Sequence, residues 1–332
     1  MPIPADRPIA VFYEHPEWFR PLFAELDRRG TPYVKLHADE HLFDPGEDPP
    51  YSLVFNRMSP SAYLRGRGDA IFYTLSWLAY LERKGVRVVN GYRAFESEIS
   101  KAGQLALLDG LGLPYPRARV IHRAEQAPAA AGGLRWPIAV KPNIGGSGAG
   151  VRRFDSLGEL AGAVESGGLE LGIDGTALVQ EFIPQEESRI VRVEVLGGEY
   201  LYGIRIYTPG NSFDLCPADV CQRVDGVELD AQICAVDAPR RGLRVEGYEP
   251  PAQVRADVER IMAAAGIEVG GIEYMVDARD GRLYYYDVNA LSNFVADAPN
   301  VVGFDPFARL ADYLEREAEA ALARSAAGKE AA

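Results

Sequence analysis

The stretch AVKPNIGGSGAGVRRF, residues 139–154, holds a lysine at the end of an apolar run and then four glycines within six residues. An apolar, strand-like segment resumes at Val151. Glycine has no Cβ, so backbone N–H groups in such a loop can come close to phosphate oxygens. Lys141, at the root of the loop, would add a positive charge beside the same phosphates. The stretch therefore predicts a strand–loop–strand hairpin that folds over a nucleotide as a lid.

Other interpretations of the loop fit the sequence less well. A dinucleotide-binding fingerprint places its glycines between the first strand and first helix of a βαβ unit, yet this loop lies in mid-chain and precedes a strand. A P-loop ends in Gly-Lys-Ser or Gly-Lys-Thr, whereas this loop ends in Gly-Val. The loop could also be a glycine-rich surface turn that has no binding role, and this interpretation stays open.

The composition is that of an ordinary globular protein. The chain has 332 residues, 47% apolar and 25% charged, which suggests two or three subdomains. Its net charge is −13 and it has no dense Lys/Arg run, so we expect no nucleic-acid partner. Its start does not resemble a signal peptide, and its longest apolar run, residues 71–81, is too short to span a bilayer. We expect a cytoplasmic protein that does not associate with membranes.

The first ninety residues alternate strands and helices. Four short apolar runs predict buried strands and two amphipathic segments predict helices: residues 9–13, 32–36, 52–56 and 86–90, and residues 17–30 and 70–84. This alternation indicates a small open parallel sheet, and such sheets bind ligands at the carboxyl ends of their strands. Arg57 directly follows the third strand. It is either a contact for a substrate carboxylate or a surface arginine.

The remaining chain predicts further helices and two antiparallel hairpins. The helices are expected at residues 97–110, 155–166, 251–265 and 305–319. One hairpin turns at the Gly-Gly pair after IVRVEVL, and the other turns at residues 279–281. Residues 209–250 are expected to be irregular, and the alanine-rich tail from residue 324 to be frayed.

A lid over phosphates requires a metal site, and the second hairpin offers one. Asp287 and Asn289 are two residues apart on a strand, so their side chains share a face. Glu273 lies on the partner strand at a similar separation from the turn. Carboxylate and amide oxygens suit Mg²⁺, which also bridges substrate phosphates. Alone, Asp and Asn at a strand end more often only make turns.

A nucleotide site also requires a purine slot and further cations. The segment VQEFIP, from Val179 to Pro184, could present its backbone to a base and Glu181 to a ribose or amino group, although it also fits a plain buried strand. Arg192 and Arg205 lie on neighbouring strands among apolar residues and tyrosines, where a guanidinium needs a partner such as a phosphate. Lys101 opens a helix, where a solvated lysine is the default.

Taken in order, these segments resemble the ATP-grasp superfamily. The resemblance rests on Lys101, AVKPNIGGSGAGV, LVQEFIP, IVRVEVLGGE and GIEYMVD…YYYDVNA, and covers about residues 95–315. It is strongest to RimK-type glutamate ligases and glutathione synthetase, with D-alanine–D-alanine ligase more distant. It implies a fold of mixed α/β and α+β type: a Rossmann-like domain at residues 1–95, ATP-grasp subdomains at 96–183 and 184–320, and a frayed tail at 321–332.

The resemblance also implies site residues. Lys101 and Lys141 would bind phosphates, Arg192 would stabilise the transferring phosphoryl group and Arg205 would assist. The larger sets are the lid (Gly145, Gly146, Ser147, Gly148 and Gly150), the adenine and ribose frame (Gln180, Glu181, Phe182 and Ile183) and the ligands of Mg²⁺ or Mn²⁺ (Glu273, Asp287 and Asn289).

The implied chemistry is ATP-dependent ligation of a carboxylate and an amine. The carboxylate attacks the γ-phosphate, and the amine attacks the resulting acyl phosphate, so ADP and phosphate are released. Catalysis then rests on positioning and charge, which fits a chain whose four histidines form no cluster. Small carboxylate and amine substrates are implied, the latter an amino acid or a peptide. A homodimer is common in the family.

The sequence departs from the family pattern in three places. Ile190 stands where an acid usually contacts the ribose, so Glu186 or Glu187 would substitute. Glu273 and Asp287 exchange the usual aspartate and glutamate. After DVN the chain reads ALSNFVADAP, so the family's acceptor cannot be carried over. Asn293 in that segment is a candidate substrate contact.

The irregular segment holds cysteines with C-x4-C-x12-C spacing, Cys216, Cys221 and Cys234. A zinc site would lack a fourth ligand, so buried free thiols are expected. A substrate-loop role that includes Cys216 is the minor hypothesis.

Three other functional classes stay open. A non-catalytic ATP-binding module is disfavoured because the lid, both lysines and all metal ligands are present. An acyl-phosphate-forming or kinase-like enzyme would need no amine. A nicotinamide dehydrogenase is the least favoured of these three classes.

Overall fold

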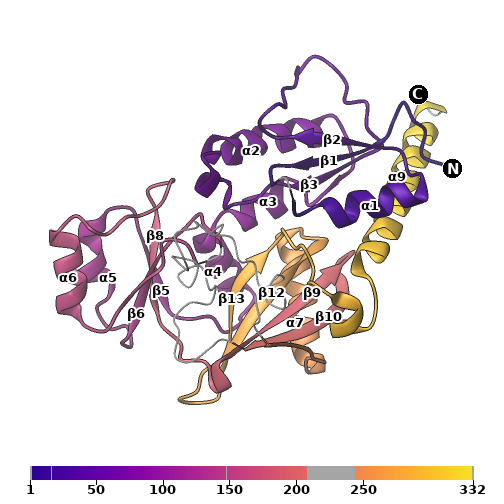
Figure 1. Cartoon of the computed structure of the whole chain (residues 1–332). Coiled ribbons are helices and arrows are strands. Elements are labelled where there is room, and N and C mark those ends of the chain that lie inside the picture. Colours follow the sequence, from indigo (N-terminus) through magenta and orange to yellow (C-terminus); the bar gives the residue numbers. More distant parts are fainter. Residues whose placement is uncertain (1, 16, 147, 208–243, 331–332) are drawn as a thin grey trace, which may run out of the picture.

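The computed structural model describes residues 2–15, 17–146, 148–207 and 244–330, and in these ranges the strands form three sheets (Figure 1). The first sheet has the order β2-β1-β3-β4, and every pairing in it is parallel. Its strands are β1 (Ile9–Tyr13), β2 (Tyr33–His37), β3 (Leu53–Arg57) and β4 (Val88–Val89). Helices α1 (Arg20–Arg29) and α2 (Gly68–Arg83) and the 3₁₀ turn η1 (Ala62–Arg65) connect them. The predicted alternation and parallel sheet are confirmed.

The second sheet carries the glycine loop. Its order is β5-β8-β6-β7, all antiparallel, with β5 (Ala118–Ile121), β6 (Ile138–Pro142), β7 (Arg152–Phe154) and β8 (Ala177–Glu181). Helices α5 (Ala127–Ala130), with the turn η2 (Ala124–Gln126) before it, and α6 (Leu157–Glu165) pack on it around a common apolar core. Ser156 caps α6. The loop joins β6 to β7, so the predicted strand–loop–strand hairpin is confirmed.

The third sheet, β11-β10-β9-β12-β13, is antiparallel and holds the two predicted hairpins. Its strands are β9 (Arg189–Leu196), β10 (Glu199–Tyr207), β11 (Arg244–Gly247), β12 (Val269–Val276) and β13 (Leu283–Asn289). Helix α7 (Ala252–Ala265) packs on one face, and η3 (Glu186–Ser188) and α8 (Ala298–Val302) flank the sheet. β11 corrects the expectation that residues 209–250 are irregular throughout.

The helix expected at residues 97–110 is in fact two helices. α3 (Tyr92–Glu98) ends before Ser100, and α4 (Lys101–Gly110) begins after it. Ser100 is extended and its hydroxyl accepts a hydrogen bond from the Gly103 N–H at 3.0 Å, which caps α4. The break places Lys101 in the first turn of α4, where its side chain reaches the third sheet.

The last helix is longer than expected, and it packs against elements from the N-terminal part of the chain. α9 (Pro306–Glu330) packs against α1 and the first sheet (Figure 1). Arg29 of α1 binds Asp312 at 2.6 Å and Glu315 at 2.9 Å. Leu322 is buried, so the helix packs against the rest of the protein at least as far as this residue, and the fraying expected from residue 324 stays a prediction. In the described ranges, no helix has the length and apolar character to cross a bilayer.

The packing of α9 can be tested at Leu322, which lies in the segment expected to be frayed. Leu322→Ala should lower the free energy of unfolding by about 2 kcal/mol or more, because it removes buried methyl groups. Leu42→Ala, at a side chain that is 82% exposed, should change it by less than about 0.5 kcal/mol. Urea titrations would measure both, and equal effects of the two substitutions would contradict a packed α9.

Candidate active site

The predicted residues converge where three parts of the fold meet: the first turn of α4, the last residues of β6 and the last residues of β13. The Lys101 ammonium binds the Asp287 carboxylate at 2.7 Å. Gln104, one turn along α4, uses its side-chain amide to bind both backbone groups of Val288, at 2.8 and 3.2 Å. These contacts hold α4 against the open edge of the third sheet. They fix the position of Asp287 relative to the lysines.

A β-bulge in the hairpin of β12 and β13 builds the carboxylate pair. Tyr274 pairs with Tyr285, but Glu273 pairs with Asp287, so Tyr286 is the extra residue. Without it, Asp287 would lie on the opposite face of the sheet, because side chains alternate. The Tyr286 hydroxyl donates to Glu273 at 2.5 Å. The prediction that Glu273 lies opposite Asp287 is confirmed, and Asn289, opposite Gly271, shares their face.

Arg192 occupies the same face, directly across from Glu273. Its guanidinium donates to Glu273 at 2.9 Å and to Glu194 at 2.5 Å. Glu194 is fully buried and one of its carboxylate oxygens has no hydrogen-bond partner in the described ranges. A Cβ at Gly271 would lie 3.0 Å from both side chains, so only glycine leaves them room. Glu194 was not among the predicted site residues, although the sequence places this acid two residues from a strand arginine and therefore on the same face.

Arg205 does not belong to this group, which corrects the prediction. β9 and β10 contain a bulge between Tyr200 and Tyr202, and beyond it Arg192 pairs with Ile204 and Arg205 with Val191. The bulge therefore turns Arg205 to the opposite face. There its guanidinium lies 3.8 Å from the centre of the Tyr248 ring.

Burial and mutual charge set the protonation of the site. Burial and the positive charge of Lys101 lower the pKa of Lys141 to about 7. Burial also acts to lower the pKa of Lys101, but its ion pair with Asp287 outweighs this and raises it. The Asp287 pKa is lowered, because Lys101 outweighs the effect of burial. Lys101 is therefore charged at neutral pH, and Lys141 titrates near it.

The glycine loop is fastened to the start of α4. The Asn143 side chain accepts from the Ala102 N–H at 2.9 Å and donates to Asp174 at 2.7 Å. Gly148 and Gly150 have φ of 71° and 73°, and a Cβ at Gly150 would lie 2.8 Å from Pro142. The predicted lid residues Gly145 and Gly146 precede these, and Ser147 lies outside the described residues.

The expected adenine frame comprises the last two residues of β8 and the two residues after it. Gln180 and Glu181 are buried, and Glu181 accepts from the Arg135 N–H at 2.9 Å. The N–H of Phe182 donates to the Pro137 carbonyl at 3.0 Å, and Ile183 packs into the core of the third sheet. The frame thus bridges the second and third sheets. The Glu181 side chain and the backbone N–H groups of Glu181 and Phe182 are thus already engaged within the protein.

The residues of the metal site fit a hard cation that also binds phosphate. Glu273 and Asp287 supply carboxylate oxygens and Asn289 an amide, the ligand types of Mg²⁺. Among the described residues no three Asp, Glu, His or Cys side chains cluster closely enough to hold a metal unaided. The set therefore suits Mg²⁺ that arrives with a nucleotide, whose phosphates complete its coordination.

The segment after β13 is held by residues from the first half of the chain. Arg57 is buried and donates to the carbonyls of Ala290, at 3.3 Å, and Ser292. Asn90 donates to the Ala290 carbonyl at 2.5 Å, and Glu98 accepts from the Ala290 N–H. Burial raises the pKa of Glu98 to about 7. Arg57 is thus neither a surface residue nor shown as a substrate contact: it positions this segment.

Within the same segment, Asn293 has a buried side-chain oxygen without a hydrogen-bond partner among the described residues. Cys216, Cys221 and Cys234 lie outside the described residues, so their expected roles stay predictions.

Comparison with known proteins follows this geometry. No family model matches the chain. The D-alanine–D-alanine ligase of Gloeobacter violaceus is 29% identical over 238 residues, which cover 65% of this chain and 72% of the relative.

Solved structures match over nearly the whole chain. The ATP-grasp ligase PsnB, complexed with a minimal precursor, superposes with a TM-score of 0.64 and 20% identity, covering 94% of this chain and 100% of that one. A RimK domain ATP-grasp protein from Sphaerobacter thermophilus gives a TM-score of 0.63 and 19% identity over 92% and 98%. The predicted ATP-grasp fold is confirmed.

The pKa of Lys141 predicts how nucleotide affinity depends on pH. A phosphate binds the charged ammonium, so ADP affinity without metal should fall at least about tenfold as pH rises from 7 to 9. The second ionisation of the phosphate, at about pH 6, is largely complete by then. Calorimetric titration of Lys141→Met should show weak, pH-independent binding, while Lys84→Met, at a surface lysine, keeps the wild-type profile. A wild-type pH profile in Lys141→Met would contradict the assignment.

The two strand arginines should differ in their effect on turnover. Arg192→Met should lower kcat by about 100-fold or more, because the guanidinium lies beside the carboxylate pair. Arg205→Met should leave kcat near the wild-type value, because the side chain is on the other face. Equal losses in steady-state ADP release would show that the face assignment is wrong.

Proposed function

We propose that the chain is an ATP-dependent ligase of the ATP-grasp type, which joins a carboxylate to an amine and forms ADP, and that Lys101, Lys141, Arg192 and the bulged hairpin carry this reaction. The observation that supports the proposal most strongly is the bulge at Tyr286, which brings Glu273, Asp287 and Arg192 to one face beside two lysines. We propose residues 1–95, 96–183 and 184–320 as the structural units that meet there.

The lysines are proposed to bind the nucleotide phosphates. Lys101 is paired with Asp287, and Lys141 is partly neutral near pH 7. A triphosphate offers stronger partners to both ammonium groups. Asp287 is then released to hold Mg²⁺ or Mn²⁺ with Glu273 and Asn289. The metal, when bound, neutralises phosphate charge.

In the first step, the substrate carboxylate attacks the γ-phosphorus, and the bond to ADP breaks. The cationic groups stabilise the charge on the transferring phosphoryl group, so no side-chain nucleophile is required. In the second step, the amine attacks the acyl carbon of the acyl phosphate and inorganic phosphate leaves. The glycine lid excludes water, which would otherwise hydrolyse the intermediate.

We propose that the acid and amine are small molecules or a peptide, because one relative is a D-alanine–D-alanine ligase and PsnB was solved in complex with a precursor peptide. We propose that the segment after β13 contacts the substrate, because its backbone is fixed by Arg57, Asn90 and Glu98 and Asn293 holds an unused acceptor there. Use of ATP fits the expected cytoplasmic location, and the expected dimer stays a prediction.

The experiment is release of ADP and phosphate from Mg-ATP with pools of carboxylates, amino acids and short peptides. A ligase should release ADP with one pool of acids and amines, and hydroxylamine should replace the amine and trap a hydroxamate. ATP binding without turnover on any pool, or ADP release without hydroxamate, would contradict the acyl phosphate.

Asp287 is the most direct test of the metal site. Asp287→Asn should lower kcat by about 100-fold or more, because one metal ligand and the partner of Lys101 are lost together. Asp280→Asn alters the turn of the same hairpin and should leave kcat near wild type. Turnover rates in Mg²⁺ and Mn²⁺ would measure both, and normal ATP consumption by Asp287→Asn would overturn the assignment.

A further inference from the structure

The first sheet reaches the glycine loop through the turn η1. Ile144, at the root of the loop, is buried in the core of the first sheet with Met58 and Ala62. A Cβ added at Gly146 would lie 3.3 Å from the Ser61 Cβ, and one added at Gly145 would lie 3.6 Å from the Tyr63 hydroxyl oxygen. Residues 61–63 therefore form a surface against which the loop rests, which we call the lid seat.

Tyr63 directs its hydroxyl toward the glycine loop. The hydroxyl lies against Gly145, and Tyr63 is close enough to Lys101 for the ammonium charge to influence it. Burial raises the pKa of Tyr63, and Lys101 only partly opposes this. The phenol is therefore protonated at neutral pH and can donate a hydrogen bond next to a lysine and the lid.

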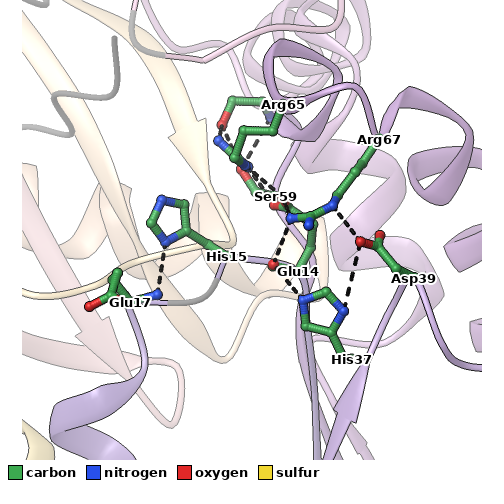
Figure 2. Close-up of polar contacts among 9 residues, drawn as sticks. Glu14, His15, Glu17, His37, Asp39, Ser59, Arg65 and Arg67 are labelled. Atoms are coloured by element: carbon green, nitrogen blue, oxygen red, sulfur yellow. Dashed lines mark hydrogen bonds and ion pairs between the residues drawn. The ribbon is translucent and has the colours of Figure 1, made fainter. Parts of the chain in front are cut away.

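An ion cluster around the buried Glu14 holds the lid seat in place (Figure 2). Glu14, directly after β1, is fully buried and accepts from the Arg65 Nε at 2.5 Å and from Arg67 at 3.1 Å. Arg67 also binds Asp39 at 2.5 Å. Arg65 is the last residue of η1, and its guanidinium lies 3.4 Å from the Ser61 hydroxyl. Glu14 thus ties the C-terminal end of the turn to the carboxyl edge of the first sheet, and Arg65 extends this contact to Ser61.

We propose that Tyr63 is a further phosphate-binding residue of this ligase, whose phenol donates a hydrogen bond to the terminal phosphoryl group of a nucleoside triphosphate. The lid seat is then the surface on which the glycine loop closes, and Glu14 is a positioning residue that acts through Arg65. The inference rests on the proposed function, because it uses the same phosphate site. It adds a residue from outside both ATP-grasp subdomains.

The test compares two nucleotides by calorimetry on the full chain with Mg²⁺. ADP lacks the terminal phosphoryl group, whereas the non-hydrolysable β,γ-imido analogue of ATP contains it. Tyr63→Phe should weaken binding of the analogue by about tenfold or more, as expected for one hydrogen bond to a charged group, and leave ADP affinity within about twofold. Glu14→Gln should show the same selective loss. A merely structural role would weaken both nucleotides together.

Tyr80→Phe is the matched control, since it removes a hydroxyl from the same part of the chain that donates to the Glu47 carbonyl at 2.6 Å, away from the loop. It should bind both nucleotides as the wild type does.

A second pair of variants tests the lid seat. Gly146→Ala should weaken the analogue because its methyl group would press on Ser61, and adding Ser61→Gly should restore binding.

The outcomes of these experiments distinguish a failure of the proposed function from a failure of the role assigned to Tyr63 and the lid seat. If the wild type binds neither nucleotide, the proposed function fails and the inference fails with it. If the wild type binds both and Tyr63→Phe behaves like Tyr80→Phe, only the role of Tyr63 is overturned. If Ser61→Gly does not restore Gly146→Ala, the lid seat is overturned.

Discussion

The ion pair between Lys101 and Asp287 is the interaction on which the arrangement of this protein depends. It joins the first turn of α4 to the last residues of β13 at 2.7 Å, in a site where burial opposes both charges. Buried charges persist only with partners, and here Lys101 faces Asp287 and Arg192 faces Glu273. A triphosphate with its metal can exchange these partners without leaving either cation unpaired. The same contacts thus hold the site in the arrangement that phosphoryl transfer requires.

Two single-residue bulges decide which side chains meet there. The bulge at Tyr286 brings Asp287 opposite Glu273, and the bulge between Tyr200 and Tyr202 moves Arg205 away from Arg192. Residue spacing in the sequence gives the strands and their partners, but it does not show an extra residue within a strand. For this reason the carboxylate pair was predicted only approximately and Arg205 was placed on the wrong face.

Local signals were sufficient for most elements, whereas long-range contacts were not visible. Apolar runs and the Gly-Gly turn predicted the strands and hairpins, and the glycine loop with Lys141 predicted the lid. The break at Ser100 and the continuation of α9 depend on packing against other elements. Glu98, Glu194 and Tyr63 escaped notice because their importance comes from neighbours distant in the sequence, such as the Ala290 backbone, Gly271 and Gly145.

The proposed mechanism depends on the acyl phosphate intermediate. Transfer of an oxygen atom from the substrate carboxylate to the released phosphate reports on this intermediate. The carboxylate substrate, identified from the pools, would be labelled with ¹⁸O and the released phosphate analysed by mass spectrometry. Attack of the carboxylate on the γ-phosphorus predicts one labelled oxygen in each phosphate, because the acyl carbon–oxygen bond breaks in the second step. Unlabelled phosphate, released together with ADP and product, would contradict the account.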